Sequence, residues 1–225
     1  MTAHWLLLPS SSLPDDDDWL NAEERNVLAG LSFPKRRAEW RLGRWVAKHA
    51  LASILGVDEP CEIQIVAAED GAPEGFIDEH PASFRISISH RGDLAACAVA
   101  PEGRVGCDLE AVEPRTSRFV HDFFTARERE WAETGPSSER DLRVALTWSA
   151  KESGLKALRV GLRRDTRSME VEIHEPYGTE AFWQSFVVTA RPEGLRMRGW
   201  WRLERDMVLT VVCDGESAPT STLPL

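Results

Sequence analysis

Two carboxylates lie two residues apart at Asp108 and Glu110, in a stretch whose composition is typical of a β-strand. Alternate residues of a strand point to the same side, so both carboxylates face one way. Further along the chain, Trp148, Glu152 and Lys156 follow one another at intervals of four, which places them along one stripe of a helix. If that stripe faces the strand, three carboxylates and one ammonium group meet.

A cluster of three carboxylates has a definite chemistry. Like charges about 4 Å apart repel by roughly 4 kcal/mol at an effective dielectric constant near 20, so the cluster requires a cation or a raised pKa. Oxygen ligands without His or Cys favour a hard cation such as Mg²⁺ or Mn²⁺, which takes its other ligands from water and a phosphate. On spacing alone a structural interpretation is the more common one. In it, Asp108 and Glu110 lie at a solvated strand edge, and Glu152 forms a helical ion pair with Lys156.

A second polar group stands at the end of an apolar strand, at Ser89 and His90. These two side chains, with the backbone amides of the glycine-containing loop after them, are candidate donors to an anion. The alternative for His90 is a loop histidine that bonds to the backbone. A Ser-His-Asp hydrolase is excluded, because Ser89 and His90 are adjacent in the chain and the sequence has no G-x-S-x-G elbow.

Periodicity and capping signals predict the elements that must position these residues. Asn21 with Glu24 predicts a helix start, and Thr125 with Glu128 repeats this capping-box pattern. We expect helices over 35–55 and 141–158, a loop over 89–93, strands over 61–67, 84–88, 94–100 and 104–110, and three or four more strands between 168 and 214. The turn at 101–103 predicts a hairpin of the strands on either side of it, and it is the candidate domain junction.

The composition is that of a folded globular chain. Its 225 residues allow one large domain or two small ones, and 42% hydrophobic with 28% charged residues lies close to globular averages. With 27 basic and 37 acidic side chains the net charge is −10, so neither nucleic acid nor a membrane is an expected partner. Four widely spaced cysteines, no basic region before the apolar run at Trp5, and no apolar window of about 18 residues predict a reduced, cytoplasmic protein without a signal peptide or membrane span.

Six short motifs stand in order along residues 36–156. They are Arg36-Arg-x-Glu-x-x-x-Gly-Arg44, Gly71-x-Pro73, Ser-x-Ser-His90, Gly106-Cys-Asp-Leu-Glu110, Phe123-Phe-Thr-Ala-Arg-Glu128 with Trp131, and Trp148-Ser-Ala-Lys-Glu-Ser-Gly-Leu-Lys156. In this order they resemble the 4'-phosphopantetheinyl transferase superfamily, specifically its surfactin-synthetase-activating, monomeric type. The resemblance implies an α+β fold of two similar α/β subdomains related by a pseudo-two-fold axis. The subdomains would be 1–102 and 103–225, with the active site between them.

The resemblance also implies an activity. The 4'-phosphopantetheine group of coenzyme A would pass to a serine hydroxyl of an apo acyl or peptidyl carrier protein, with release of 3',5'-ADP. Asp108, Glu110 and Glu152 would hold Mg²⁺ or Mn²⁺. Glu152 would act as the general base, and Lys156 would offset charge on the phosphates. The residues implied for binding the nucleotide end of coenzyme A are Arg37, Arg44, Ser89 and His90.

Two positions depart from the family pattern, and other functions stay open. Ala72 stands where broad-specificity members often have a lysine, and Gly154 replaces a bulky residue inside a helix. The arginines between 159 and 167 are either the surface for an acidic carrier protein or a solvated basic loop. The alternatives to the transferase are a Mg²⁺-dependent phosphoester hydrolase and a non-catalytic carrier-binding homologue.

Overall fold

The computed structural model describes residues 2–134, 136–174 and 182–222. In these residues the chain forms a mixed α+β fold, which confirms the fold class expected from the sequence. The described helices are α1 (Ala22–Ala29), α2 (Pro34–Leu55), α3 (Ser117–Phe123), α4 (Ala126–Thr134) and α5 (Arg140–Ala157).

Residues 2–100, which we call the N-terminal half, contain two of the three described sheets. Their strands are β1 (His4–Pro9), β2 (Ile63–Ala67), β3 (Pro73–Ile77), β4 (His80–Pro81), β5 (Arg85–Arg91) and β6 (Leu94–Ala100). One sheet has the order β2-β3-β4. The other has the order β12-β1-β6-β5, in which β12 (Thr220–Ser221) returns from the end of the described chain and pairs parallel to β1.

Residues 105–213, which we call the C-terminal half, form a five-stranded antiparallel sheet. Its strands are β7 (Val105–Ala111), β8 (Met169–Ile173), β9 (Gln184–Ala190), β10 (Leu195–Glu204) and β11 (Met207–Cys213). The sheet order is β7-β11-β10-β9-β8, so the first strand of this half pairs with its last strand. The N-terminal half begins in the same way, because β1 pairs antiparallel with β6.

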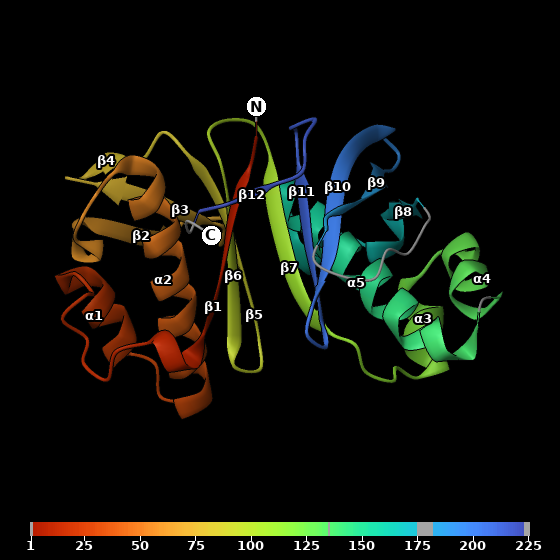
Figure 1. Cartoon of the computed structure of the whole chain (residues 1–225), viewed down its shortest axis with the longest axis horizontal. Helices are drawn as coiled ribbons and strands as arrows, with labels where there is room; N and C mark the ends of the chain where they lie inside the picture. The colour runs from red at the N-terminus through yellow and green to blue at the C-terminus, as the bar shows by residue number, and fades with distance from the viewer. Residues whose placement is uncertain (1, 135, 175–181, 223–225) are drawn as a thin grey trace.

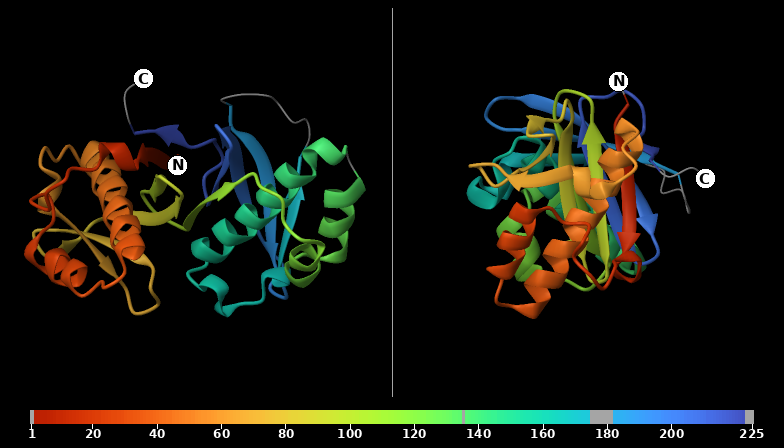
Figure 2. Two further views of the ribbon diagram at one scale, coloured as in Figure 1. Left: turned by 90° about the horizontal axis from the view of Figure 1, so that it is seen from below. Right: turned by 90° about the vertical axis from the view of Figure 1, so that its left-hand side faces the viewer.

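The strands of the two larger sheets meet at the centre of the molecule, with α2 on the outer side of one and α5 against the other (Figure 1). Figure 2 shows the two halves side by side, each with its own long helix. Each half has its own apolar core around that helix, and further buried side chains of β6, β7 and β11 fill the junction. Burial of this apolar surface fixes the position of β5 and β6 relative to β7.

The main helix predictions are confirmed. The side chain of Asn21 accepts from the backbone of Glu24, and the side chain of Glu24 reaches back to the backbone of Asn21. The long helix α2 ends at Gly56, whose φ of 67° is a left-handed cap. The strand predicted to contain Asp108 and Glu110 is β7.

Two loop and turn predictions are wrong. The strands on either side of residues 101–103 do not form a hairpin: β6 pairs with β1 and β5, and β7 pairs with β11. The apolar run at Trp5, which we did not expect to be a strand, occupies the edge of β6 that the hairpin requires. The predicted loop over 89–93 is also too long, since β5 continues to Arg91 and pairs with Leu94 across a turn at Gly92.

None of the helices in the described ranges is long and apolar enough to cross a lipid bilayer.

Candidate active site

The site is built where β5 of the N-terminal half lies against β7 of the C-terminal half. These strands belong to different sheets, and serine side chains take the place of the missing ladder bonds. The Ser87 hydroxyl accepts from the backbone N–H of Cys107 at 2.9 Å, and the Ser89 hydroxyl accepts from that of Leu109 at 3.2 Å. Ser89 also donates to Oδ1 of Asp108 at 2.9 Å, so residues of the two halves meet directly at this carboxylate.

The close approach of α5 to β7 depends on Gly106. A Cβ at this position would lie 2.0 Å from the backbone oxygen of Ser153 and 2.5 Å from the backbone nitrogen of Ala157. Any side chain would therefore push the helix away from the strand. Because α5 lies so close, Nζ of Lys156 reaches Oδ1 of Asp108 at 2.7 Å.

The carboxylate of Asp108 is buried and only half satisfied. Its residue is 3% exposed, and Oδ1 accepts from both Ser89 and Lys156. Its Oδ2 is buried without a hydrogen-bond partner among the described residues. Burial opposes the charge on Lys156, but Asp108, Cys107 and Glu152 together outweigh it and raise the pKa of the ammonium group. Lys156 therefore stays protonated beside Asp108.

Glu152 lies one turn before Lys156 on α5. Burial raises its pKa to about 7, and the negative charges of Asp108 and Glu110 act in the same direction, while Lys156 opposes them. No hydrogen bond or ion pair of its side chain is found within the described ranges. The ion pair expected from the structural interpretation is instead formed between Lys156 and Asp108. A carboxyl group with this pKa can exchange a proton near neutral pH.

Glu110 lies two residues after Asp108 on β7, so its side chain points to the same side of the strand, towards α5. Its Oε1 accepts from the indole N–H of Trp148 at 3.1 Å, and its Oε2 accepts from the guanidinium of Arg115 at 3.2 Å. Nε of Arg91 lies 3.8 Å from the same Oε2. Burial and nearby Asp108 raise the pKa of Glu110, and the two arginines oppose this shift. The condition stated for the cluster is met, because Glu110 contacts Trp148 and Asp108 contacts Lys156 of the same stripe.

The chemistry of these donors suits a hard cation. Asp108 has an unpartnered buried oxygen, and its negative charge raises the pKa of both Glu110 and Glu152, as expected for groups that share a small volume. Within the described ranges, however, no three or more His, Cys, Asp or Glu side chains are arranged as a set of metal ligands. The three carboxylates lie close together, but their oxygens are not arranged as a set of ligands around one cation position.

His90 lies near this cluster, at the end of β5. Its Nδ1 is 4.0 Å from Oε1 of Glu39 on α2. Burial lowers its pKa, and Lys156 contributes to that decrease while Glu39 and Asp108 oppose it. The positive charge of Lys156 therefore lies close to both Ser89 and His90, and an anion site at this point requires such a charge.

The structure does not bring Arg37 and Arg44 into this cluster through any contact found in the described residues. Arg37 donates to the backbone oxygen of Leu28, at the end of α1. The guanidinium of Arg44 lies over the ring of Trp40, with 4.7 Å between Cζ and the ring centroid. Its Nε is buried without a partner among the described atoms, and burial lowers the pKa of the group. The role expected for these two arginines stays a prediction.

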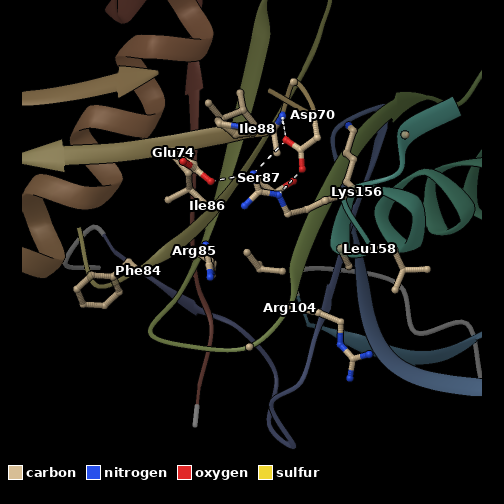
Figure 3. Close-up of a pocket in the computed structure, with 18 residues that line it drawn as sticks. Asp70, Glu74, Phe84, Arg85, Ile86, Ser87, Ile88, Arg104, Lys156 and Leu158 are labelled. Atoms are coloured by element: carbon tan, nitrogen blue, oxygen red, sulfur yellow. Dashed lines mark hydrogen bonds and ion pairs between the residues drawn. The ribbon is translucent and has the colours of Figure 1, made fainter. Parts of the chain in front are cut away.

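A cavity of about 500 Å³ opens beside the cluster, between the two halves. Its lining comes from residues 70–74, 84–88, 103–105, 156–159 and 161. In Figure 3, Lys156 and Leu158 line it from the side of α5, and Arg85 lines it from β5. This volume lies in the range of small-molecule and cofactor sites.

Several charged residues at the site were not predicted from the sequence. Arg159 pairs with Asp70 at 2.7 Å and with Glu74 at 2.8 Å, and so joins the end of α5 to the opposite wall of the cavity. Arg91 reaches Glu110 from the end of β5, and Arg115 reaches it from the loop before α3. No local sequence pattern connects these partners, because each contact depends on how the two halves meet.

The predicted basic surface over 159–167 is largely neutralised within the chain. Arg159 is engaged by Asp70 and Glu74, and Arg164 pairs with Glu193. Arg167 pairs with Asp165 at 2.9 Å. Arg163 donates to backbone oxygens. The charge count of this stretch therefore overstates the positive charge that it offers to a partner.

Two family profiles match the chain. Residues 23–100 match the 4'-phosphopantetheinyl transferase N-terminal domain, and residues 104–193 match the 4'-phosphopantetheinyl transferase superfamily. Similar proteins include the 4'-phosphopantetheinyl transferase HetI of Nostoc sp., 28% identical over 161 residues, which are 69% of this chain and 66% of that protein. The L-aminoadipate-semialdehyde dehydrogenase-phosphopantetheinyl transferase of Xenopus laevis is 25% identical over 191 residues, which are 76% of this chain and 62% of that protein.

A shorter match has higher identity. The 4'-phosphopantetheinyl transferase AcpT of Escherichia coli K12 is 35% identical over 82 residues, which are 36% of each chain. The matched regions therefore span less than two thirds of the length of each of these three relatives.

Proposed function

Because the chain belongs to the 4'-phosphopantetheinyl transferase superfamily, we propose that it transfers 4'-phosphopantetheine from coenzyme A to a serine of an apo acyl or peptidyl carrier protein. The second product is 3',5'-ADP. The observation that carries the proposal is the group formed by Asp108, Glu152 and Lys156 beside the cavity between the halves. It supplies a proton acceptor and a fixed cation where a phosphate ester can bind.

Glu152 is the proposed general base. The serine oxygen of the carrier forms a bond to the phosphorus that bears the pantetheine arm, and the bond from that phosphorus to the 3',5'-ADP oxygen breaks. The serine proton passes to the Glu152 carboxylate, whose pKa of about 7 suits this transfer at neutral pH. Lys156, held by Asp108, faces the charge that develops on the phosphate oxygens and stabilises it.

The donor chemistry also fits a divalent cation. Asp108, Glu110 and Glu152 are the proposed ligands, and the unpartnered Oδ2 of Asp108 supports this assignment. Mg²⁺, or Mn²⁺ in its place, would neutralise charge on the pyrophosphate of coenzyme A when bound.

The cavity is the proposed site of the nucleotide end of coenzyme A. Ser89, whose hydroxyl lies 3.2 Å from Nζ of Lys156, and His90 are proposed to contact its phosphates. Arg37 and Arg44 remain candidates for binding the 3'-phosphate. Nε of Arg44 has no hydrogen-bond partner among the described residues, so its N–H is free to donate to a phosphate oxygen. Ala72, which stands where the resemblance implies a lysine in broad-specificity members, lies in the wall of the cavity and offers no charged group there.

The division into subdomains 1–102 and 103–225, related by a pseudo-two-fold axis, is also part of the proposal. It is supported by the shared strand pairing of first with last strand in each half. It is further supported by two buried Lys–Glu pairs in matching positions, Lys48 with Glu24 and Lys151 with Glu128. A monomer in the cytoplasm remains the expected state.

The test is the intact mass of an apo carrier protein after incubation with this chain, coenzyme A and Mg²⁺. We expect a gain of one phosphopantetheine group, which EDTA abolishes. No gain with any of several acyl and peptidyl carriers would contradict the proposal. Cleavage of coenzyme A without a change in carrier mass would indicate the phosphoester hydrolase instead.

A further inference from the structure

We propose that Arg115 and Trp148 are positioning residues that fix the carboxylate of Glu110 for the divalent cation, an inference that rests on the proposed function. We call the three side chains Arg115, Phe119 and Trp148 the Glu110 clamp. Neither Arg115 nor Phe119 belongs to the motifs that predicted the site. Their contribution follows from the contacts around Glu110 alone.

The clamp holds both oxygens of Glu110. Trp148 donates its indole N–H to Oε1 at 3.1 Å, and Arg115 donates from its guanidinium to Oε2 at 3.2 Å. The Glu110 side chain is 13% exposed, so water contributes little to its orientation. A carboxylate bonded at both oxygens by separate groups cannot rotate about its last torsion without losing one of the bonds.

The two donors are themselves locked together through Phe119. Cζ of Arg115 lies 5.3 Å from the centroid of the Phe119 ring, in a cation–π contact. The rings of Phe119 and Trp148 lie 5.0 Å apart at an angle of 67°, a favourable edge-on arrangement. The contacts therefore close into a ring from Glu110 through Arg115, Phe119 and Trp148 back to Glu110. Each member restricts the conformations of the next.

The backbone of the clamp is anchored as well. Arg140, at the start of α5, donates to the backbone oxygen of Arg115 at 3.2 Å. Because Trp148 is on the same helix, α5 fixes both arms of the clamp. The loop that carries Arg115 thus cannot move away from Glu110 independently of the helix that carries Glu152.

The need for a clamp follows from the charges. Asp108 lies near Glu110, and repulsion between the carboxylates favours rotamers of Glu110 that point away from the cation position. The positive charge of Arg115 is already partly neutralised by Glu113, because its guanidinium lies 3.1 Å from that carboxylate. Arg91 pairs with Glu113 at 2.6 Å. Orientation of Glu110, and not added positive charge, is therefore the main effect of Arg115 on cation binding.

The test compares Arg115→Gln with the unchanged chain in the presence of saturating coenzyme A and no carrier. The thermal unfolding midpoint is recorded against Mg²⁺ concentration, which reports cation binding without any turnover. Loss of a partner that orients a metal ligand typically weakens binding by about 10- to 100-fold. We expect the Mg²⁺ concentration that produces a given rise in the midpoint to increase at least about tenfold. In transfer assays kcat at saturating Mg²⁺ should recover to within about twofold.

Arg118→Gln is the matched control. Arg118 lies three residues further along, is 90% exposed and pairs only with Asp122 among the described residues, so its variant should bind Mg²⁺ like the unchanged chain. Trp148→Phe keeps a ring against Phe119 but removes the donor to Oε1, and should weaken Mg²⁺ binding in the same direction. If both donors act on one carboxylate, the effects of Arg115→Gln and Trp148→Phe are not additive in the double variant.

An unchanged dependence of the unfolding midpoint on Mg²⁺ in folded Arg115→Gln and Trp148→Phe would overturn the clamp and leave the proposed transferase function intact. Equal weakening in Arg118→Gln would also overturn it, since the effect would then follow general surface charge. If the unchanged chain transfers the group but shows no response to Mg²⁺, both the clamp and the assigned cation ligands fail. If it shows no transfer at all, the proposed function itself fails.

Discussion

The N-terminal and C-terminal halves bury the same ion pair in the same setting. In the N-terminal half, Oε2 of Glu24 lies 2.5 Å from Nζ of Lys48, and Oε1 of Glu24 accepts from the backbone N–H of Ile65 at 2.9 Å. Glu24 is at the same time the third helical residue of a capping box that begins at Asn21. One carboxylate thus joins α1, α2 and β2.

The C-terminal half repeats each of these contacts. Oε2 of Glu128 lies 2.8 Å from Nζ of Lys151, and Oε1 accepts from the backbone N–H of Val171 at 2.8 Å. Glu128 also forms reciprocal capping bonds with Thr125. Both lysines are fully buried, and burial lowers the pKa of each against the opposing effect of its glutamate.

The difference lies in the residues beside this shared frame. Lys151 is followed by Glu152, whereas Lys48 is followed by His49, which bonds to the backbone oxygen of Trp45. The first strand of the C-terminal half carries Asp108 and Glu110, while β1 has no carboxylate. The buried pair therefore serves the fold in both halves, whereas the proposed chemistry rests on residues present in only one of them.

The sharpest test of this difference is Glu152→Gln against His49→Gln. The first variant removes the proposed proton acceptor and one charge of the carboxylate cluster, so transfer should fall by about 10²- to 10⁴-fold. The second changes the matching position of the N-terminal half and should alter transfer by less than about threefold. Initial rates of carrier modification measure both. Near-normal transfer by folded Glu152→Gln would contradict the assignment of the base.

The shared frame is tested by replacing the buried lysines. Lys48→Met and Lys151→Met each leave a buried glutamate without its partner, so each should lower the free energy of unfolding by about 3 to 5 kcal/mol. Urea denaturation followed by circular dichroism measures the loss. Lys35→Met is the control, because Lys35 is 89% exposed and should be nearly neutral. A large loss of unfolding free energy in one variant and none in the other would show that the two buried pairs do not have equivalent roles.

The contact between strand and helix also differs between the halves. A Cβ on Gly106 collides with the backbone of α5, whereas a Cβ on Gly43 of α2 meets only Cγ2 of Ile88, at 3.3 Å. Gly106→Ala should lower the free energy of unfolding by about 1 to 3 kcal/mol. It should also reduce transfer by more than about tenfold, because Lys156 moves away from Asp108.

Gly43→Ala should change the free energy of unfolding by less than about 1 kcal/mol, since the gain in helix propensity offsets the tighter contact. Thermal unfolding and initial rates of both variants make this comparison. Equal effects of the two substitutions would show that α5 does not need its closer approach.

The smallest effect is expected at the ion pair of Arg159 with Asp70, which lie in different halves. Arg159 lowers the pKa of Asp70 to about 2. A carboxyl with a lowered pKa stabilises the fold above its unfolded value, and this contribution is lost as the pH falls from about 4 to about 2. Asp70→Asn should therefore show a shallower loss of stability over this range than the unchanged chain. Because the Asp70 side chain is 32% exposed, the difference should shrink at high salt. Parallel acid curves for the two proteins would exclude this contribution.

The sequence predicted the parts of this molecule that depend on local patterns. The capping residues Asn21 and Thr125, the two long helices and the strand carrying Asp108 and Glu110 all follow from spacing within one element. The approach of β7 to the Trp148 stripe was stated only as a condition. The structure explains it, because Gly106 has no side chain that would hold α5 away from the strand.

What the sequence did not predict depends on contacts between distant segments. The edge of β6 is taken by β1, about 90 residues earlier in the chain, and no signal in the turn at 101–103 reveals that competitor. The same holds for Arg115 at Glu110 and for Arg159 at Asp70. Gly154 was expected only as a weak point in a helix, but a Cβ there would lie 2.7 Å from Cε of Met169 and 3.0 Å from Cγ1 of Val188, so a side chain would require these neighbours to shift.

The central claim is that the carboxylate cluster of the C-terminal half transfers a group to a carrier and does not merely cleave coenzyme A. The most direct measurement follows one reaction in two ways, by the intact mass of the carrier and by chromatography of the nucleotide product. We predict that one 3',5'-ADP is released for each phosphopantetheine gained, and that Glu152→Gln lowers both products by about 10²- to 10⁴-fold. Release of 3',5'-ADP without a matching gain in carrier mass would contradict it.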